Sequence, residues 1–416
     1  MGTSGRSRPR RPAVGAALLA GIVLTGCSPT PAPTPAPNPT ARPVPSASGT
    51  TRTACEVPLP ASWRTAFVAG ELKVPAGERA VLTEVGPAAR WTVVQLSDDR
   101  RRRAALVQDG RSPRTLLDFA DPVEHQLLSA DVDGRWAAFA VLEGRTLASP
   151  WTLRSWDERT GRTRVLARSG GRPGPLPQPV VRGGRVFWAQ GTGGGKATVY
   201  VAPASGGVPR ALHTGVLDTP FAAGGLLAWR EADASGTATR LSAVSFATMR
   251  TAPLPAPLAK LRDFRSAASD GSSTWDGSDR SDGSDRSDGS DRSDGSDRSD
   301  RSTWAWIAGE QEPKLMVWRP GQPAPVAELT GSPAAEGIDQ VGISGELVTW
   351  RTPEAAYALD LRSAAYSRIT PQYGYAQARG GALAIAHSEG DAKAAGSRSV
   401  IQVVRADRLP KLPECG

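Results

Sequence analysis

The chain has 416 residues, of which 39% are hydrophobic and 22% charged, with 45 glycines and 36 prolines. It is too polar for a multi-span membrane protein and, with 12 tryptophans, too rich in large apolar residues for a chain disordered throughout. The net charge of +9 includes four arginines close to the start of the chain; without them 46 basic residues face 41 acidic ones, and no nucleic-acid partner is expected.

Residues 1–26 are typical of an export signal. Four arginines, at positions 6, 8, 10 and 11, precede an uncharged apolar run of 12 residues, 13–24. As a helix this run spans about 18 Å, whereas a bilayer core is roughly 30 Å thick. The pattern therefore predicts the core of a signal peptide over residues 1–26 rather than a permanent membrane span.

The signal ends in Leu24-Thr25-Gly26-Cys27, which resembles the lipobox of bacterial lipoproteins. The resemblance implies that Cys27 becomes the lipid-bearing N-terminus, acylated with palmitate-type chains, of a protein anchored to the extracytoplasmic face of the cell membrane. Two or three acyl chains would make that anchoring stable. The pair Arg10-Arg11 leaves twin-arginine export as an alternative route. An excess of 44 arginines over six lysines points to a GC-rich genome.

Residues 27–54 form the predicted linker. Eight prolines occur between Ser28 and Ala54, and Val44 is the only branched apolar residue there. Such a segment cannot bury enough surface to fold, so it is expected to be a disordered, largely extended spacer.

Two further cysteines, Cys55 and Cys415, lie at the two ends of the part expected to fold. An extracytoplasmic location permits disulfides, and a circular fold brings its termini together, so we expect these two to pair. Two unrelated free thiols are the alternative.

A short motif recurs after Cys55: a small or glycine turn, then an apolar run with an aromatic residue. Most copies recur at intervals of roughly 36 to 50 residues, and each is followed by two more extended stretches around a polar turn. Strands are also expected within 63–81 and at 409–412, and no ten-residue amphipathic helical pattern is present. The seven copies begin at Arg90, Gly134, Gly184, Gly225, Ser302, Gly345 and Gly381.

The interval between the copies at Gly225 and Ser302 is much longer than the others. It contains a low-complexity block in which Asp-Gly-Ser-Asp-Arg-Ser is repeated between Asp276 and Ser299, flanked by the duplicated word Ser-Thr-Trp at 273–275 and 302–304. Residues 276–301 are therefore expected to be a disordered insert in a loop. Its aspartates also suggest a calcium loop, but interrupting arginines and the lack of a closing glutamate disfavour that alternative.

The spacing of the copies, with three or four strands in each unit, predicts an all-β fold, a β-propeller over residues 55–416. Seven blades fit the copies best, with six or eight left open. The segments 133–139 and 156–162, with an Asp-Gly turn and a Thr-Gly hairpin, resemble TolB-like and WD40-like propeller repeats. Most tryptophans are then expected to pack between blades.

Known catalytic motifs are absent from the sequence. The three histidines, His125, His213 and His387, lie in different repeats and lack metal-ligand spacing, and neither a Gly-x-Ser-x-Gly elbow nor a phosphate-binding loop occurs. We therefore expect no catalytic, metal or cofactor residues and no enzyme activity. Four clustered arginines, 100–103, could meet an anionic envelope component.

The function expected from these features is a ligand- or protein-binding, scaffolding module at the cell envelope, held at the membrane by lipid. Its partner would be an envelope protein or a small ligand. The alternatives are a propeller enzyme acting on an extracellular glycan or another substrate, and a stalked domain with a purely structural role. Paired carboxylates with perturbed pKa values at the channel mouth would favour the enzyme.

Overall fold

The computed structural model describes residues 51–98, 100–108, 111–121, 123–233, 239–262, 264–270, 302–309, 312–330, 332–390 and 398–415. The predicted signal peptide, Cys27, nearly all of the linker and the insert at 276–301 lie outside these residues. The described part belongs to one compact unit, Ala47–Gly416. No helix in this part is both long and apolar enough to cross a membrane.

Among the described residues the regular secondary structure is almost entirely β-strand, which confirms the all-β prediction. Two short strands, β1 (Arg52–Thr53) and β2 (Cys55–Glu56), precede the helix α1 (Ala61–Ala69), and a one-turn helix α2 (Ala256–Ala259) lies in a later loop.

The remaining described strands form antiparallel groups that follow one another along the chain, called here the first to the seventh group. The first comprises β3 (Arg79–Val85), β4 (Thr92–Ser97), β5 (Arg102–Val107) and β6 (Arg114–Asp118); the second β7 (His125–Asp133), β8 (Trp136–Glu143), β9 (Trp151–Asp157) and β10 (Arg162–Arg168); the third β11 (Val180–Arg182), β12 (Arg185–Gly193), β13 (Lys196–Pro203) and β14 (Arg210–Gly215). The fourth comprises β15 (Phe221–Ala223), β16 (Leu226–Ala232) and β17 (Thr239–Ser245); the fifth β18 (Phe264–Ser269), β19 (Trp304–Ala308), β20 (Lys314–Trp318) and β21 (Ala327–Leu329); the sixth β22 (Gln340–Ser344), β23 (Leu347–Arg351), β24 (Ala356–Asp360) and β25 (Ala365–Arg368); the seventh β26 (Tyr375–Arg379), β27 (Ala382–Glu389) and β28 (Arg398–Arg405).

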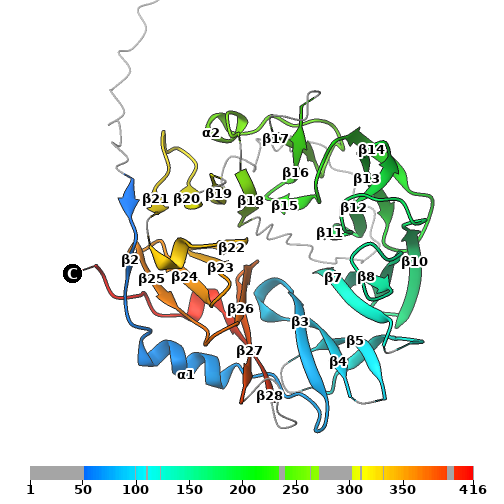
Figure 1. The fold of residues 1–416 in the computed structure, drawn as a ribbon, viewed down its shortest axis with the longest axis horizontal. Helices are drawn as coiled ribbons and strands as arrows, with labels where there is room; N and C mark the ends of the chain where they lie inside the picture. The colour runs from blue at the N-terminus through cyan, green and yellow to red at the C-terminus, as the bar shows by residue number, and fades with distance from the viewer. Residues whose placement is uncertain are drawn as a thin grey trace, which may run out of the picture. The chain divides into compact units, whose positions relative to one another are not determined.

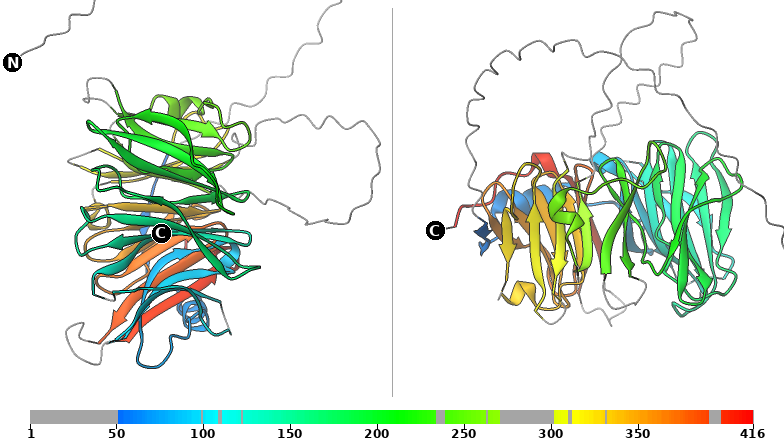
Figure 2. Two further views of the ribbon diagram at one scale, coloured as in Figure 1. Left: turned by 90° about the vertical axis from the view of Figure 1, so that its right-hand side faces the viewer. Right: turned by 90° about the horizontal axis from the view of Figure 1, so that it is seen from above.

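These groups are arranged in chain order around a common centre, with the first strand of each group innermost (Figures 1 and 2). This arrangement is a β-propeller. The sixth and seventh groups share one sheet through a single parallel bridge, Ile343 with Arg379, so the number of blades stays a prediction.

The hydrophobic core lies between the groups rather than within one centre. Each buried cluster joins a group to its neighbour in the chain, and one joins the seventh group to the first through residues such as Val94 and Ala384. The eleven described tryptophans are all buried, as expected of residues that pack between blades.

The innermost strands all end on the same side of the propeller, which we call the exit face and define by the turns after β3, β7, β11, β15, β22 and β26 (Figure 2). Hydrogen bonds connect these turns from group to group: the Ala88 amide donates to the Gly380 carbonyl at 2.7 Å, and the Gly381 amide to the Ser344 Oγ at 2.7 Å. The turns after the third strands lie on this face too, because the Glu158 amide donates to the Arg135 carbonyl at 2.9 Å.

Two of the expected strands are wrong. Residues 61–69 form α1, because Trp63 and Phe67, four positions apart, both pack against the seventh group. Residues 409–412 form no strand either; their chain instead receives a hydrogen bond of 2.8 Å from the Trp63 Nε1 at the Pro410 carbonyl.

The fourth strand position of the seventh group is filled from the N-terminal side of the chain. The Leu72 amide donates to the Ile401 carbonyl and the Val403 amide to the Gly70 carbonyl, both at 2.8 Å. A Cβ on Gly70 would lie 2.3 Å from the Val403 oxygen, so this close pairing requires glycine. Within the range 63–81, where strands were expected, the segment Gly70–Leu72 thus pairs with the edge of β28.

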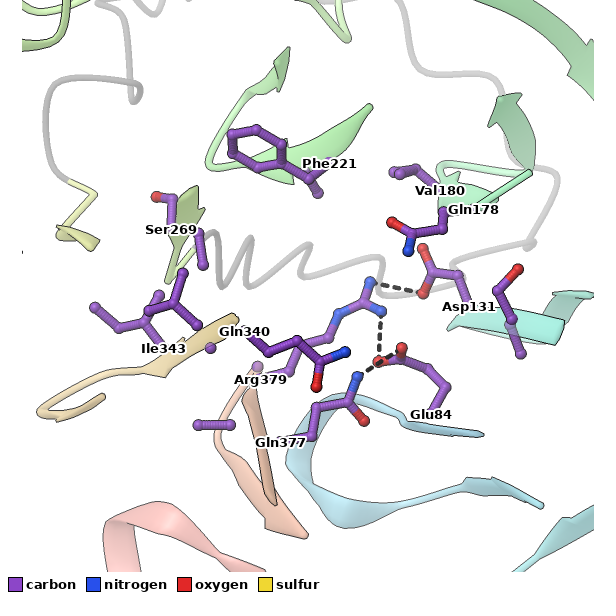
Figure 3. A pocket seen from close by; sticks show the side chains of 18 of the residues that line it. Glu84, Asp131, Gln178, Val180, Phe221, Ser269, Gln340, Ile343, Gln377 and Arg379 are labelled. Atoms are coloured by element: carbon purple, nitrogen blue, oxygen red, sulfur yellow. Dashed lines mark hydrogen bonds and ion pairs between the residues drawn. The ribbon is translucent and has the colours of Figure 1, made fainter. Parts of the chain in front are cut away.

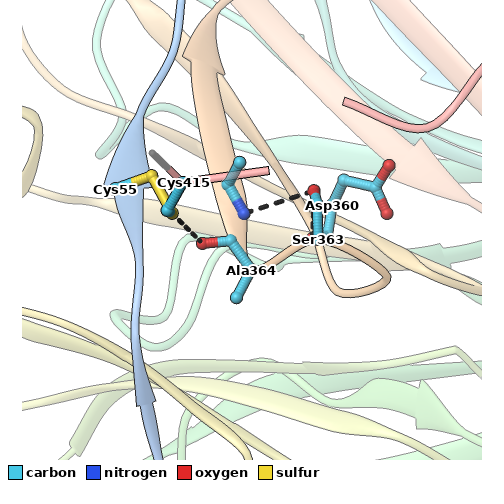
Figure 4. Close-up of a disulfide and its surroundings, with 6 residues drawn as sticks. Cys55, Asp360, Ser363, Ala364 and Cys415 are labelled. Carbon is cyan, nitrogen blue, oxygen red and sulfur yellow. Dashed lines mark hydrogen bonds between the residues drawn. A yellow bond between two sulfur atoms is a disulfide. The ribbon is translucent and has the colours of Figure 1, made fainter. Parts of the chain in front are cut away.

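The termini are held at the rim of the fifth and sixth groups. Strands β1 and β2 pair in parallel with the outer strands β21 and β25, and Cys55 is joined to Cys415 by a disulfide with a Cα–Cα distance of 6.0 Å (Figure 4). The fully buried Asp360 fastens the C-terminal segment, since its Oδ2 accepts a hydrogen bond of 2.9 Å from the Leu412 amide.

Candidate functional site

A central cavity of about 570 Å³ is the candidate site, and every innermost strand contributes to its wall (Figure 3). The volume falls in the range of small-ligand pockets. Its wall is charged or polar where β3, β7, β11 and β26 meet, and largely apolar along β15, β18 and β22, where Phe221, Ala267 and Ile343 lie.

The period of two along a strand explains how β26 supplies polar groups to the cavity. Ala376 and Ala378 are buried in the core between groups, while the alternating Tyr375, Gln377 and Arg379 line the cavity.

Arg379 lies between two carboxylates from different groups (Figure 3). Its Nη1 donates to Glu84 Oε1 at 2.8 Å, and its Nη2 lies 2.6 Å from Asp131 Oδ1. Glu84 belongs to β3 and Asp131 to β7, so this ion cluster joins the seventh group to the first and second.

The other carboxylate oxygens of the cluster are also occupied. Gln377 Nε2 donates to Glu84 Oε2 at 2.7 Å, and the Val181 amide donates to Asp131 Oδ2 at 2.6 Å. Each of the four oxygens of the two carboxylates therefore has a protein partner.

The pKa values of the cluster reflect burial and mutual charge. Burial raises the pKa of Glu84 above its ordinary value; the Arg379 charge opposes that rise, and the Asp131 charge adds to it. Burial alone would lower the pKa of Arg379, but the Asp131 and Glu84 charges outweigh it and raise that pKa. Burial, with Glu84 adding to it, also raises the pKa of Tyr375.

Several polar groups on the cavity wall have no hydrogen-bond partner among the described residues. No hydrogen bond to a described residue is made by the side-chain amides of Gln178 and Gln340 or by the Tyr375 hydroxyl. The Nε of Arg182 is buried and likewise has no hydrogen-bond partner among the described residues. Burial lowers the pKa of Arg182, with the Arg379 charge adding to this effect. These groups could donate to or accept from a polar ligand whose apolar part lies against the β15–β18 wall.

The residues singled out from the sequence do not gather in this cavity. Cys27 lies outside the described residues, and Cys55 and Cys415 are at the rim. The three histidines lie on β7, β14 and β27, and no group of three or more His, Cys, Asp or Glu side chains among the described residues could hold a metal ion.

The arginine run tips the β4–β5 hairpin as expected, but most of it is engaged. Arg101 pairs with Asp118 at 2.6 Å, Arg103 binds both oxygens of Glu78 at 2.9 Å, and Arg102 donates to a backbone carbonyl. Little of this positive charge is left for an anionic partner.

Sequence reasoning missed the ion cluster altogether. Glu84 and Arg379 are 295 residues apart, and only the ring brings their strands together. One signal in the sequence could have indicated it, the alternation Tyr-Ala-Gln-Ala-Arg of β26. Burying polar side chains on an innermost strand costs free energy unless they have partners, so this pattern predicts polar partners on neighbouring strands.

No family model matches this sequence, and no curated protein sequence matches it. Among solved structures, it is similar to a prolyl endopeptidase (TM-score 0.46, 12% identity, 82% of this chain and 48% of that one) and to TolB from Acinetobacter baumannii (0.39, 14%, 71% and 64%). It is also similar to the β-propeller domain of the trilobed protease from Pyrococcus furiosus (0.45, 8%, 74% and 89%). The chain spans about half the length of the prolyl endopeptidase, and at these identities the likenesses concern the fold alone.

Proposed function

We propose that this protein is a lipid-anchored envelope protein whose propeller binds a small ligand or a segment of a partner protein in its central cavity. The observation that carries the proposal is the cavity itself, about 570 Å³ in volume, polar on one side and largely apolar on the other. The side-chain amides of Gln178 and Gln340 on its wall make no hydrogen bond to a described residue. An amphipathic cavity of this size with a few converging polar groups is suited to orienting one ligand.

The state of the two carboxylates supports binding over catalysis. A general acid or base must have an atom free to reach the substrate. Glu84 and Asp131 use their oxygens on Arg379, Gln377 and backbone amides, and the Arg379 guanidinium occupies the space between them. The cluster therefore forms a fixed polar part of the cavity wall and links the seventh group to the first and second.

The second candidate is an enzyme acting on a glycan or another extracellular substrate. It is favoured by one observation, the raised pKa of Glu84 beside a second carboxylate, which is the pattern of a general acid paired with an ionised partner. Catalysis would require a substrate to displace Arg379 from at least one of the two carboxylates.

Filling the cavity tests the binding proposal. In the full-length chain, exported and extracted in detergent, Gln178→Trp/Gln340→Trp places two bulky rings in the cavity without breaking an internal hydrogen bond between described residues. The matched control is Val208→Trp, because Val208 is 90% exposed on a turn of the third group. Native mass spectrometry and protein identification would compare what each form retains.

A bound species kept by the wild type and the control but lost from the double variant supports the proposal. Identical retention by all three forms refutes it. Glycan cleavage that persists in the wild type and disappears in Glu84→Gln would favour the enzyme instead.

The anchor is tested separately by the intact mass of the native protein. Lipid on Cys27 is expected, and a chain that still begins at Met1 without lipid would remove the anchoring part of the proposal.

A further inference from the structure

The exit face carries a concentration of exposed arginines on the first three groups. The turns there expose arginines that make no side-chain hydrogen bond or ion pair with a described residue. There are five such arginines, and all lie at ends of strands on the exit face. Arg111 follows β5, Arg159 follows β9, and the strands β10, β12 and β14 begin at Arg162, Arg185 and Arg210.

The carboxylates of this region are already engaged with other groups. Glu158 lies 3.6 Å from both Arg90 and Arg114, and Asp157 lies 3.6 Å from Arg135. None of the five arginines forms an ion pair with a described carboxylate, and we call these five residues together the basic patch.

Direct contacts between neighbouring groups make the basic patch one continuous surface. Glu158 of the second group pairs with arginines of the first, and Thr163 Oγ1 donates to the Leu116 carbonyl at 2.7 Å. Ser155 Oγ of the second group donates to the Ala204 carbonyl of the third, also at 2.7 Å. The turns bearing the patch are thus fixed relative to one another.

The chain enters the propeller on the same face. Thr51 Oγ1 donates to the Pro325 carbonyl at 2.7 Å, and Pro325 lies in the turn after β20, the third strand of the fifth group. The spacer between Cys27 and Thr51, if extended and rich in polyproline conformation, reaches about 70 Å at most. A lipid on Cys27 would keep the exit face within reach of the bilayer.

We propose that the basic patch docks the propeller, exit face down, on an anionic phospholipid surface; this rests on the lipid anchoring proposed above. Arginines attract anionic headgroups by charge and by paired hydrogen bonds to phosphate. Docking would place the exit-face mouth of the cavity against the membrane and leave the opposite face for ligands from outside.

The test compares two triple variants of the full chain, each carrying Cys27→Ser so that acyl chains do not contribute to binding. The patch variant is Arg159→Gln/Arg185→Gln/Arg210→Gln. The control is Arg79→Gln/Arg100→Gln/Lys196→Gln, which removes equal charge from exposed positions on the opposite face. Binding is measured to vesicles of phosphatidylcholine alone and with about 30% phosphatidylglycerol.

We expect binding to the phosphatidylglycerol vesicles to weaken about fivefold for each patch arginine removed, or about 100-fold for the triple variant. The control variant should bind like the chain that carries Cys27→Ser alone. A salt concentration of about 0.5 M should abolish the difference in binding between the patch variant and the control. If circular dichroism shows that the triple variant folds poorly, the single variant Arg159→Gln replaces it, and its binding to the phosphatidylglycerol vesicles should be about fivefold weaker.

Equal binding by both triple variants would overturn the proposal. So would binding that requires the patch but is directed to a soluble polyanion, such as a DNA duplex, with none to the vesicles. The vesicle comparison and the intact-mass measurement test different proposals. A native chain without lipid on Cys27 would refute the anchor, whereas the vesicle comparison tests the basic patch in chains that lack the lipid.

Discussion

Removing Arg379 should destabilise the ring at the point where its last group meets the first two. In Arg379→Met the carboxylates of Glu84 and Asp131, whose side chains are 11% and 1% exposed, lose their shared cation. Breaking a buried ion pair by deleting one partner costs about 3–5 kcal/mol. We expect a loss of that size in the free energy of unfolding at neutral pH.

The loss should depend on pH with a definite sign. The pKa of Glu84 is already raised by burial, and Arg379 is what opposes the rise, so in the variant this pKa is higher still. A group whose pKa is higher in the folded state contributes stability below its unfolded pKa and loses it as pH rises through the folded value. The deficit of the variant should therefore be smaller near pH 5 than near pH 7.5, by up to about 1.4 kcal/mol per pH unit for one carboxyl.

Urea unfolding followed by tryptophan fluorescence measures both effects, with the disulfide kept intact. Arg79→Met is the matched control, because Arg79 is exposed on the same strand as Glu84 and has no side-chain partner among the described residues. Adding Glu84→Gln to Arg379→Met should restore part of the stability at neutral pH, since one of the two stranded charges is removed. A loss below about 1 kcal/mol, or one that is independent of pH, would refute the structural role assigned to the cluster.

Three further predictions concern the closure of the ring and the insert. Peptide mapping without reduction should recover Cys55 joined to Cys415, and Cys415→Ser should lower the free energy of unfolding by at most about 6 kcal/mol, the chain-entropy ceiling for a separation of 360 residues; two alkylatable thiols would contradict this. Gly70→Ala should lower stability by about 1–3 kcal/mol because its Cβ meets the Val403 oxygen, whereas Gly225→Ala, with open space around it, should be nearly neutral by thermal denaturation. Deleting residues 276–304 should leave the melting temperature nearly unchanged. The Thr303 amide donates to Asp270 Oδ1 at 2.8 Å, and after the deletion the duplicated pair Thr274-Trp275 can take the place of Thr303-Trp304. A large drop in melting temperature would mean that the insert is integral to the fold.

The strands of the propeller were largely predictable from local pattern. A glycine turn such as Gly134 (φ 58°) or Gly345 (φ 59°) needs a left-handed backbone that few other residues adopt, and the apolar run after it is a buried strand. Both signals reside in a few neighbouring residues, so the sequence alone sufficed to place them and to indicate an all-β ring.

The tertiary structure decided what depends on partners remote in the chain. Gly70–Leu72 is too short to be recognised as a strand, and it pairs as one only because β28, near the other end of the chain, offers an unpaired edge. Residues 61–69 are a helix for the same reason, since the burial of Trp63 against the seventh group outweighs the lack of a strong local helical pattern. Glu84, Asp131 and Arg379 meet, and the arginines of the basic patch share one face, because ring closure sets distances that no local pattern encodes.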